Sequence, residues 1–189
     1  MSVDFAAART NMVESQVRTA DVTDLPIQDA MRLVPREALL GANKAHLAYA
    51  DAETEYAPGR WMLRPRDVAK LLQMLHPRPG ERGLGIAAPY ASAILEAMGL
   101  IVTRIDAREA PPPGAGFDVI VCEGAVTRAP TAWTAALAPG GRLGVVERAG
   151  PQGRAMLYLR TGDKVGARPM FDSTPPVLAG FEPVLGFTF

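Results

Sequence analysis

The chain has 189 residues, of which 48% are hydrophobic and 21% charged, so it is long enough to bury a core of its own. Lys and Arg together number 20, as do Asp and Glu, and this balance argues against binding to nucleic acid or to an anionic membrane surface. The single cysteine, Cys122, excludes an intramolecular disulfide and is typical of a reducing cytoplasm. We expect no signal peptide and no transmembrane span, because no apolar stretch of about eighteen residues occurs.

The N-terminal part of the chain, residues 1–78, is predicted to be mostly helical. Its expected elements are helices over 6–18, 26–34 and 66–75, a short helical restart at Pro35, and an irregular stretch over 47–55. Asp24 fits the N-cap position of the second helix, whose apolar residues follow the i, i+3, i+4, i+7 spacing.

At about residue 79 the pattern changes, and a strand over 83–86 is followed by a tight turn and a helix over 91–98. A strand that enters a helix through a short turn is where α/β folds bind nucleotide-like cofactors. Such a turn normally contains glycine, which lets backbone N–H groups approach the ligand closely. Here the turn is Ala87-Ala88-Pro89, and Pro89 also lacks an N–H donor. The framework of a cofactor site is therefore present, whereas its ligand-facing groups are largely absent.

The rest of the chain continues the alternation of strands and helices. The expected elements are strands over 100–106 and 117–122, a stiff connector over 111–114, a helix over 130–137, a turn and strand over 139–146, a hairpin of 154–160 with 165–171, and a last edge strand over 184–189. This order predicts an α/β protein whose mostly parallel sheet ends in an antiparallel hairpin. We expect a helical region over 1–78 and an α/β domain over 79–189 that together form one compact unit.

Several short motifs are spread over the whole chain. They are Gln16-Val17-Arg18, the stretch 29–37, Ala48-Tyr49-Ala50-Asp51, Phe117-Asp118-Val119-Ile120, Leu137-Ala-Pro-Gly-Gly-Arg-Leu143 and the stretch 154–162. The most specific is Val34-Pro35-Arg36-Glu37. Together these motifs resemble the protein-L-isoaspartate O-methyltransferase family, a branch of the class I S-adenosylmethionine-dependent methyltransferases. The resemblance implies a Rossmann-like sheet, S-adenosylmethionine as the methyl donor, and isoaspartyl carboxylates of proteins as the substrate.

The chain departs from the family pattern at three places. Active members carry an acidic residue and a glycine-rich loop at the first strand, where this chain has Gly85 and the turn 87–89. The serine of the family's substrate segment is replaced by Leu63. Only residues 107–116 separate Asp106 from the next strand, so the family's third strand and its crossover are predicted to be deleted. That loss leaves the second strand at an open sheet edge, which favours a partner protein or self-association.

The resemblance also implies a set of site residues, although it assigns no catalytic residue. The cofactor would contact Gly85, Ala87, Ala88, Tyr90, Asp106 and Glu123, and the substrate would contact Tyr49, Trp61 and Arg64. No metal is expected, because His46 and His76 lack the spacing of metal ligands.

Each of these assignments has a simpler alternative. Asp106 binds the cofactor ribose or is a solvated carboxylate at a strand end; Glu123 lies near the methyl donor or is a rim carboxylate that accepts nearby N–H groups. Tyr49 and Trp61 line the substrate pocket or are packing aromatics, and Arg64 meets a substrate carboxylate or begins a solvated helix.

Two functions follow from this sequence. The first is methyl transfer by ancestry, impaired or lost in this chain. The alternative is a non-catalytic scaffold or subunit that binds a partner protein through the old fold. The stretch 85–89 separates them: an enzyme should have a ligand-shaped hollow there, and a scaffold should have it filled by side chains such as Tyr90 or Leu63.

Overall fold

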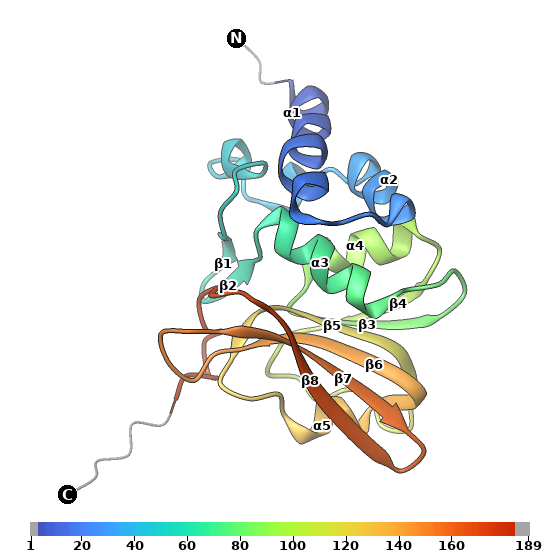
Figure 1. Ribbon diagram of the computed structural model, residues 1–189. Coiled ribbons are helices and arrows are strands. Elements are labelled where there is room, and N and C mark those ends of the chain that lie inside the picture. The colour runs from blue at the N-terminus through green and yellow to red at the C-terminus, as the bar shows by residue number, and fades with distance from the viewer. Residues whose placement is uncertain (1–3, 184–189) are drawn as a thin grey trace, which may run out of the picture.

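The computed structural model describes residues 4–183 (Figure 1). Its elements are α1 (Phe5–Met12), η1 (Val13–Val17), η2 (Arg18–Ala20), α2 (Leu25–Leu33), η3 (Arg36–Leu39), η4 (Ala45–Leu47), β1 (Thr54–Ala57), β2 (Arg60–Met62), α3 (Pro65–Leu75), β3 (Arg82–Ile86), α4 (Pro89–Ala97), β4 (Ile101–Ile105), β5 (Phe117–Val126), α5 (Thr131–Ala135), β6 (Leu137–Glu147), β7 (Arg154–Thr161) and β8 (Lys164–Asp172).

The main sheet has the strand order β4-β3-β5-β6-β7-β8. Its first four strands are parallel to one another, and β7 and β8 form the antiparallel end. Helices α3 and α4 cover one face, α5 lies on the opposite face, and α1 and α2 stack above α3 and α4 (Figure 1). The predicted α/β class and its C-terminal hairpin are confirmed.

The N-terminal helices form where the sequence predicts them. The Asp24 carboxylate accepts the backbone N–H of Ile27 at 3.1 Å and caps α2 as expected. The apolar side of α3 is fully buried. It consists of Val68, Leu71, Leu72 and Leu75. The expected irregular stretch over 47–55 is partly wrong, because Thr54 begins a small hairpin, β1–β2. Strands of three and four residues are too short to show a periodic pattern.

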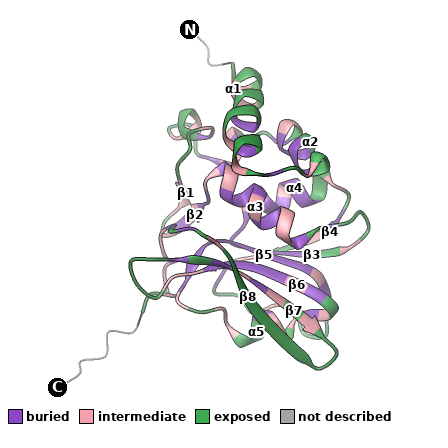
Figure 2. Cartoon of the chain, viewed as in Figure 1, coloured by how far each residue is buried: buried purple, intermediate pink, exposed green. Residues whose placement is uncertain are grey.

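Two buried clusters fill the molecule, one on each face of the sheet. The larger joins residues of the N-terminal helices to α3, α4 and the upper face of the sheet. Figure 2 shows the buried segments mainly in α3, α4 and the central strands, whereas α1 is largely exposed and β8 is exposed along nearly its whole length. The boundary at residue 79 stays a prediction.

The second half of the chain differs from the sequence prediction in its details. Helix α5 spans Thr131–Ala135 rather than 130–137, because Leu137 already pairs with Phe117 and begins β6. The expected turn at residue 139 therefore lies inside β6, where Gly140 has φ +79° and the register shifts. The predicted strand over 184–189 lies outside the described residues.

The connector 106–116 contains neither a helix nor a strand, as expected for a deleted third strand. It nevertheless links β4 to the parallel strand β5 on the other side of β3, so a crossover connection without a helix or strand remains after the deletion. An extended chain advances about 3 Å per residue, so the connector 106–116 is long enough to pass over β3 without a helix. Ala107 and Ala115 place the connector on the α5 face of the sheet.

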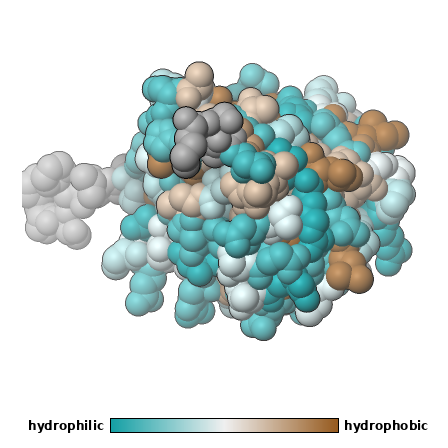
Figure 3. Space-filling model, turned by 90° about the horizontal axis from the view of Figure 1, so that it is seen from above, coloured by the Kyte–Doolittle hydropathy of each residue, from teal (hydrophilic) through white to brown (hydrophobic). Residues whose placement is uncertain are grey.

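The face of the molecule seen from above, on the side of the N-terminal helices, is mainly hydrophilic, with small separate groups of hydrophobic residues (Figure 3). Among residues 4–183 no helix combines the length and the apolar character needed to cross a membrane. In the same residues no three His, Cys, Asp or Glu side chains are grouped so that they could hold a metal ion.

Candidate functional site

The turn between β3 and α4 lies at the carboxyl end of the parallel strands, where α/β folds bind ligands. Its backbone is bonded within the chain: the Ala87 N–H donates to the Ile105 carbonyl at 2.9 Å, and the Tyr56 hydroxyl donates to the Ala87 carbonyl at 3.1 Å. Ala87 has φ +46°, in the left-handed region that a side chain disfavours. The turn therefore keeps a glycine-like conformation without a glycine.

The N-terminus of α4 is capped by Glu123 of β5. The Glu123 carboxylate accepts the N–H groups of Tyr90 at 2.9 Å and Ala91 at 2.7 Å, and its other oxygen accepts the Leu63 N–H at 3.2 Å. Pro89 has no N–H, and the Ser92 N–H donates to the Ala88 carbonyl within the helix. These bonds occupy the N–H groups of residues 90–92, so a ligand would have to displace an existing acceptor to bind them.

Glu123 is fully buried, so it is not the rim carboxylate that the simpler interpretation expects. Its oxygens do accept nearby N–H groups, as that interpretation also states. Burial raises the pKa of Glu123, whereas the charge of Arg36 and the three N–H groups oppose this rise. Burying the charged carboxylate of Glu123 costs free energy, and the charge of Arg36 and the three N–H groups offset part of that cost.

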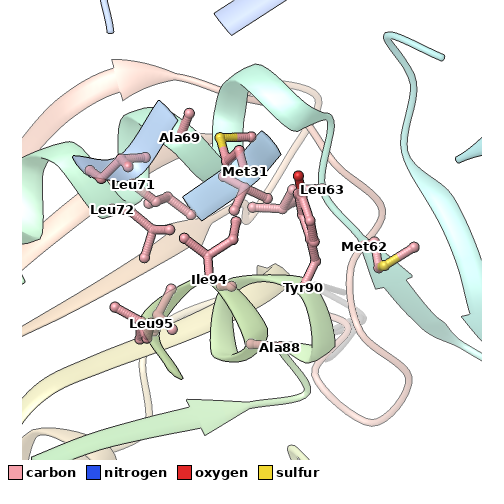
Figure 4. Packing of buried hydrophobic residues seen from close by; sticks show 14 of the residues in the cluster. Met31, Met62, Leu63, Ala69, Leu71, Leu72, Ala88, Tyr90, Ile94 and Leu95 are labelled. Atoms are coloured by element: carbon pink, nitrogen blue, oxygen red, sulfur yellow. The ribbon is translucent and has the colours of Figure 1, made fainter. Parts of the chain in front are cut away.

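Arg36 is the positive charge that faces this region, and it is also fully buried. Its guanidinium donates to the carbonyls of Ala48 and Leu63, both at 2.7 Å, and lies 4.6 Å from the centre of the Tyr90 ring. Tyr90 stands beside Leu63 above α4 in Figure 4. Tyr90 and Leu63 are both fully buried, so side chains pack the space between α4 and the N-terminal segment.

Asp106 follows β4 and is paired with Arg60, which sequence reasoning did not single out. Both Asp106 oxygens accept guanidinium N–H groups of Arg60 at 2.7 Å. The hydrogen bonds from Arg60 lower the pKa of Asp106 to about 2. The carboxylate at this strand end is thus bound by a side chain of the β1–β2 hairpin, while 40% of the Asp106 side chain stays exposed to solvent.

An open cavity of about 300 Å³ lies beside this turn. It is lined by Tyr56, Gly85, Ala87, Ala88, Pro89, Ser92, Arg104, Ile105, Asp106 and Glu109. The structure therefore brings together four of the predicted cofactor residues, Gly85, Ala87, Ala88 and Asp106. Tyr90 and Glu123 do not line the cavity.

Two curated proteins that align with most of the chain carry the same name. The chain is 34% identical over 184 residues to "Protein-L-isoaspartate O-methyltransferase" of Methylorubrum extorquens (strain PA1), covering 82% of this chain and 80% of the relative. A protein of the same name from Methylorubrum populi is 33% identical, over 81% of this chain and 85% of its own. The chain belongs to the protein-L-isoaspartate O-methyltransferase family. No family profile matches the chain.

Solved structures of protein-L-isoaspartate O-methyltransferases share the fold. One aligns with a TM-score of 0.73 at 18% identity, covering 93% of this chain and 67% of its own. Another, from Plasmodium falciparum in complex with S-adenosyl-L-homocysteine, also aligns with a TM-score of 0.73, at 14% identity, covering 90% of this chain and 97% of its own.

At Gly85, where the resemblance places an acidic residue in active members, a side chain would collide with Ser92 in its present orientation. A Cβ atom on Gly85 would lie 1.9 Å from the Ser92 Oγ and 3.2 Å from its Cβ. Ser92 is buried, and its Oγ has no hydrogen-bond partner among the described residues. The two residues are thus complementary in size, and the α4 side chain occupies the space beside Gly85.

The predicted substrate residues are held by contacts within the chain. Tyr49 accepts the Arg9 Nε–H at 2.8 Å and donates to Glu37. Arg64 is the N-cap residue of α3 and pairs with Asp67 at 2.9 Å. Trp61 is half-buried on β2. The roles of Tyr49, Trp61 and Arg64 toward a substrate stay predictions.

Three residues of this region escaped the sequence analysis: Arg36, Arg60 and Ser92. Arg36 lies within the most specific motif, which could have flagged it as a buried cation. Arg60 follows a Pro-Gly turn and has no distinguishing pattern. Ser92 looks like any small residue on a helix, and only the distance to Gly85 reveals its effect.

Lowering the pH from about 4 to about 2 is expected to remove the stability that Asp106 contributes. Its pKa is about 2 in the folded chain, against an ordinary value of 3.8, so its contribution is present above pH 4 and lost as the pH falls through 2. Because 40% of the side chain is exposed, solvent screening limits the loss to roughly 1 kcal/mol. Urea unfolding of the native chain and Asp106→Asn at both pH values measures it; equal pH dependence of the two proteins contradicts the prediction.

Proposed function

We propose that this family member has lost methyl transfer from S-adenosylmethionine to isoaspartyl carboxylates and acts as a protein-binding scaffold. One observation carries the proposal: in the first turn of α4 the N–H groups of Tyr90, Ala91 and Ser92 are all bonded within the chain. In α/β folds these N–H groups bind the charged part of a ligand. Here a ligand carboxylate would have to displace Glu123 and leave a second buried negative charge beside it.

Two further contacts support this proposal. Ser92 fills the space beside Gly85, where the resemblance places an acidic side chain in active members. Arg60 binds both oxygens of Asp106, the residue that would otherwise accept ribose hydroxyls. The residues at these positions therefore fit S-adenosylmethionine poorly.

A protein is the class of partner that best fits the chain. The relatives' names assign them a protein substrate, so the ancestral fold presented a surface to polypeptide. The strand β4 also pairs only with β3 among the described residues, which leaves one of its edges open to another chain. We therefore infer that this chain kept the ability to bind protein after it lost methyl transfer.

An active enzyme is the second candidate. The cavity beside the β3–α4 turn favours it, because this hollow lies where a methyl donor would bind and is open to solvent. In that case the chain would bind the donor without the glycine-rich loop. Binding of the donor separates the two candidates directly.

Calorimetric titration with S-adenosylmethionine and S-adenosyl-L-homocysteine is the deciding measurement. We expect no binding at millimolar ligand, which corresponds to less than about 4 kcal/mol of affinity. The Methylorubrum extorquens relative, titrated in parallel, is the positive control. Binding in the micromolar range, or methyl incorporation into an isoaspartyl peptide, would overturn the proposed loss of function.

A further inference from the structure

The two edges of the main sheet differ in how they resist pairing with another chain. The outer strand β8 contains Pro169, Lys164 and Arg168, and its register with β7 shifts at Ala155. Prolines, cations and bulges are the features that protect an edge strand. At the other edge, β4 reads Ile-Val-Thr-Arg-Ile, with no proline and no register shift against β3. Within residues 4–183, the β4 edge is therefore the one open to strand addition.

The free backbone groups of β4 lie at two positions. The Ile101 N–H donates to Glu81 at 2.9 Å and the Ile105 carbonyl accepts from Ala87 at 2.9 Å, so the backbone groups at both positions point toward β3. In a parallel strand the N–H and C=O of one residue point to the same side, and this side alternates along the strand. The groups of Val102 and Arg104 therefore point outward.

This arrangement is complementary to itself. If a second copy of β4 pairs antiparallel about a two-fold axis at Thr103, Val102 of each copy lies opposite Arg104 of the other. Because both residues present N–H and C=O outward, each pair exchanges two hydrogen bonds. Thr103 then lies opposite Thr103 in a close, non-hydrogen-bonded pair.

The side chains of the two copies are also complementary in this register. Val102 packs against the larger of the two buried clusters, and Arg104 pairs with Glu96 of α4 at 2.7 Å, so both side chains face α4. Ile101, Thr103 and Ile105 consequently face the opposite side, from which the family's crossover helix is missing. Ile101 is 70% exposed, and the two-fold pairing places it against Ile105 of the second copy.

We propose that two copies of this chain pair through the β4 edges to form one continuous antiparallel junction between their sheets. The proposal does not depend on whether the chain binds S-adenosylmethionine. A five-residue strand pair buries less than the roughly 1,200–2,000 Å² of a standard stable interface. The dimer is therefore in concentration-dependent equilibrium with the monomer, with a dissociation constant in the micromolar range.

Sedimentation velocity of the full chain, from low micromolar to several hundred micromolar, tests this directly. The native chain is expected to approach twice the monomer mass as concentration rises. Thr103→Lys places two like charges directly opposite each other and is expected to weaken dimerisation by about tenfold or more. Thr103 is exposed, so this substitution leaves the monomer folded, as a thermal melt will verify.

Two matched variants control for general effects of charge and strand propensity. Ala167→Lys adds the same charge to an exposed position on the β8 edge and is expected to leave the dissociation constant unchanged. Thr103→Val keeps a β-branched side chain and is expected to dimerise at least as tightly as the native chain. A constant monomer mass, or equal weakening by the two lysine variants, would overturn the proposal.

Discussion

Replacing Glu123 by alanine is expected to lower the free energy of unfolding by about 3–5 kcal/mol. The substitution leaves three buried N–H groups, those of Leu63, Tyr90 and Ala91, without an acceptor. It also opens a cavity at a fully buried position and removes the negative charge that faces Arg36. Urea unfolding at neutral pH measures the loss.

The Glu123→Gln variant is the matched control. Its amide oxygen still accepts the N–H groups of Tyr90 and Ala91, but its NH₂ group cannot accept from Leu63. We expect a smaller loss, of about 1–3 kcal/mol. If alanine and glutamine were equally well tolerated, the carboxylate would not be the cap of α4, and the argument for a closed helix N-terminus would fail.

Much of the fold could be predicted from the sequence because its signals are local. The apolar spacing of α3, the N-cap at Asp24 and the continuous apolar run of β5 each lie within a few residues. The mistakes lie where long-range pairing decides the outcome. Leu137 joins β6 because Phe117 lies beside it, and no window around Leu137 contains that information.

The site could be predicted only in part for the same reason. The turn without glycine indicates a changed cofactor region, and Gly85 marks a departure from the family pattern. What fills the region could not be deduced, because Glu123 reaches α4 from another strand and Arg60 reaches Asp106 across 46 residues of sequence. Hydrogen-bond partners so far apart leave no periodic signal in one sequence.

Replacing Arg36 by methionine is expected to cost about 3–5 kcal/mol in the native background. The guanidinium bonds the carbonyls of Ala48 and Leu63, and its charge opposes the rise that burial causes in the pKa of Glu123. Methionine fills a similar volume, so the loss reports the charge and its hydrogen bonds rather than an empty space. Chemical denaturation at neutral pH gives the number.

The double variant Arg36→Met/Glu123→Gln shows whether the two buried charges act as a unit. Removing one charge leaves the other buried and uncompensated, whereas removing both eliminates that penalty. The combined loss should therefore be smaller than the sum of the single losses by at least about 1 kcal/mol. Strict additivity would mean that Arg36 and Glu123 are independent, and Arg36 would then stabilise the N-terminal segment only through Ala48 and Leu63.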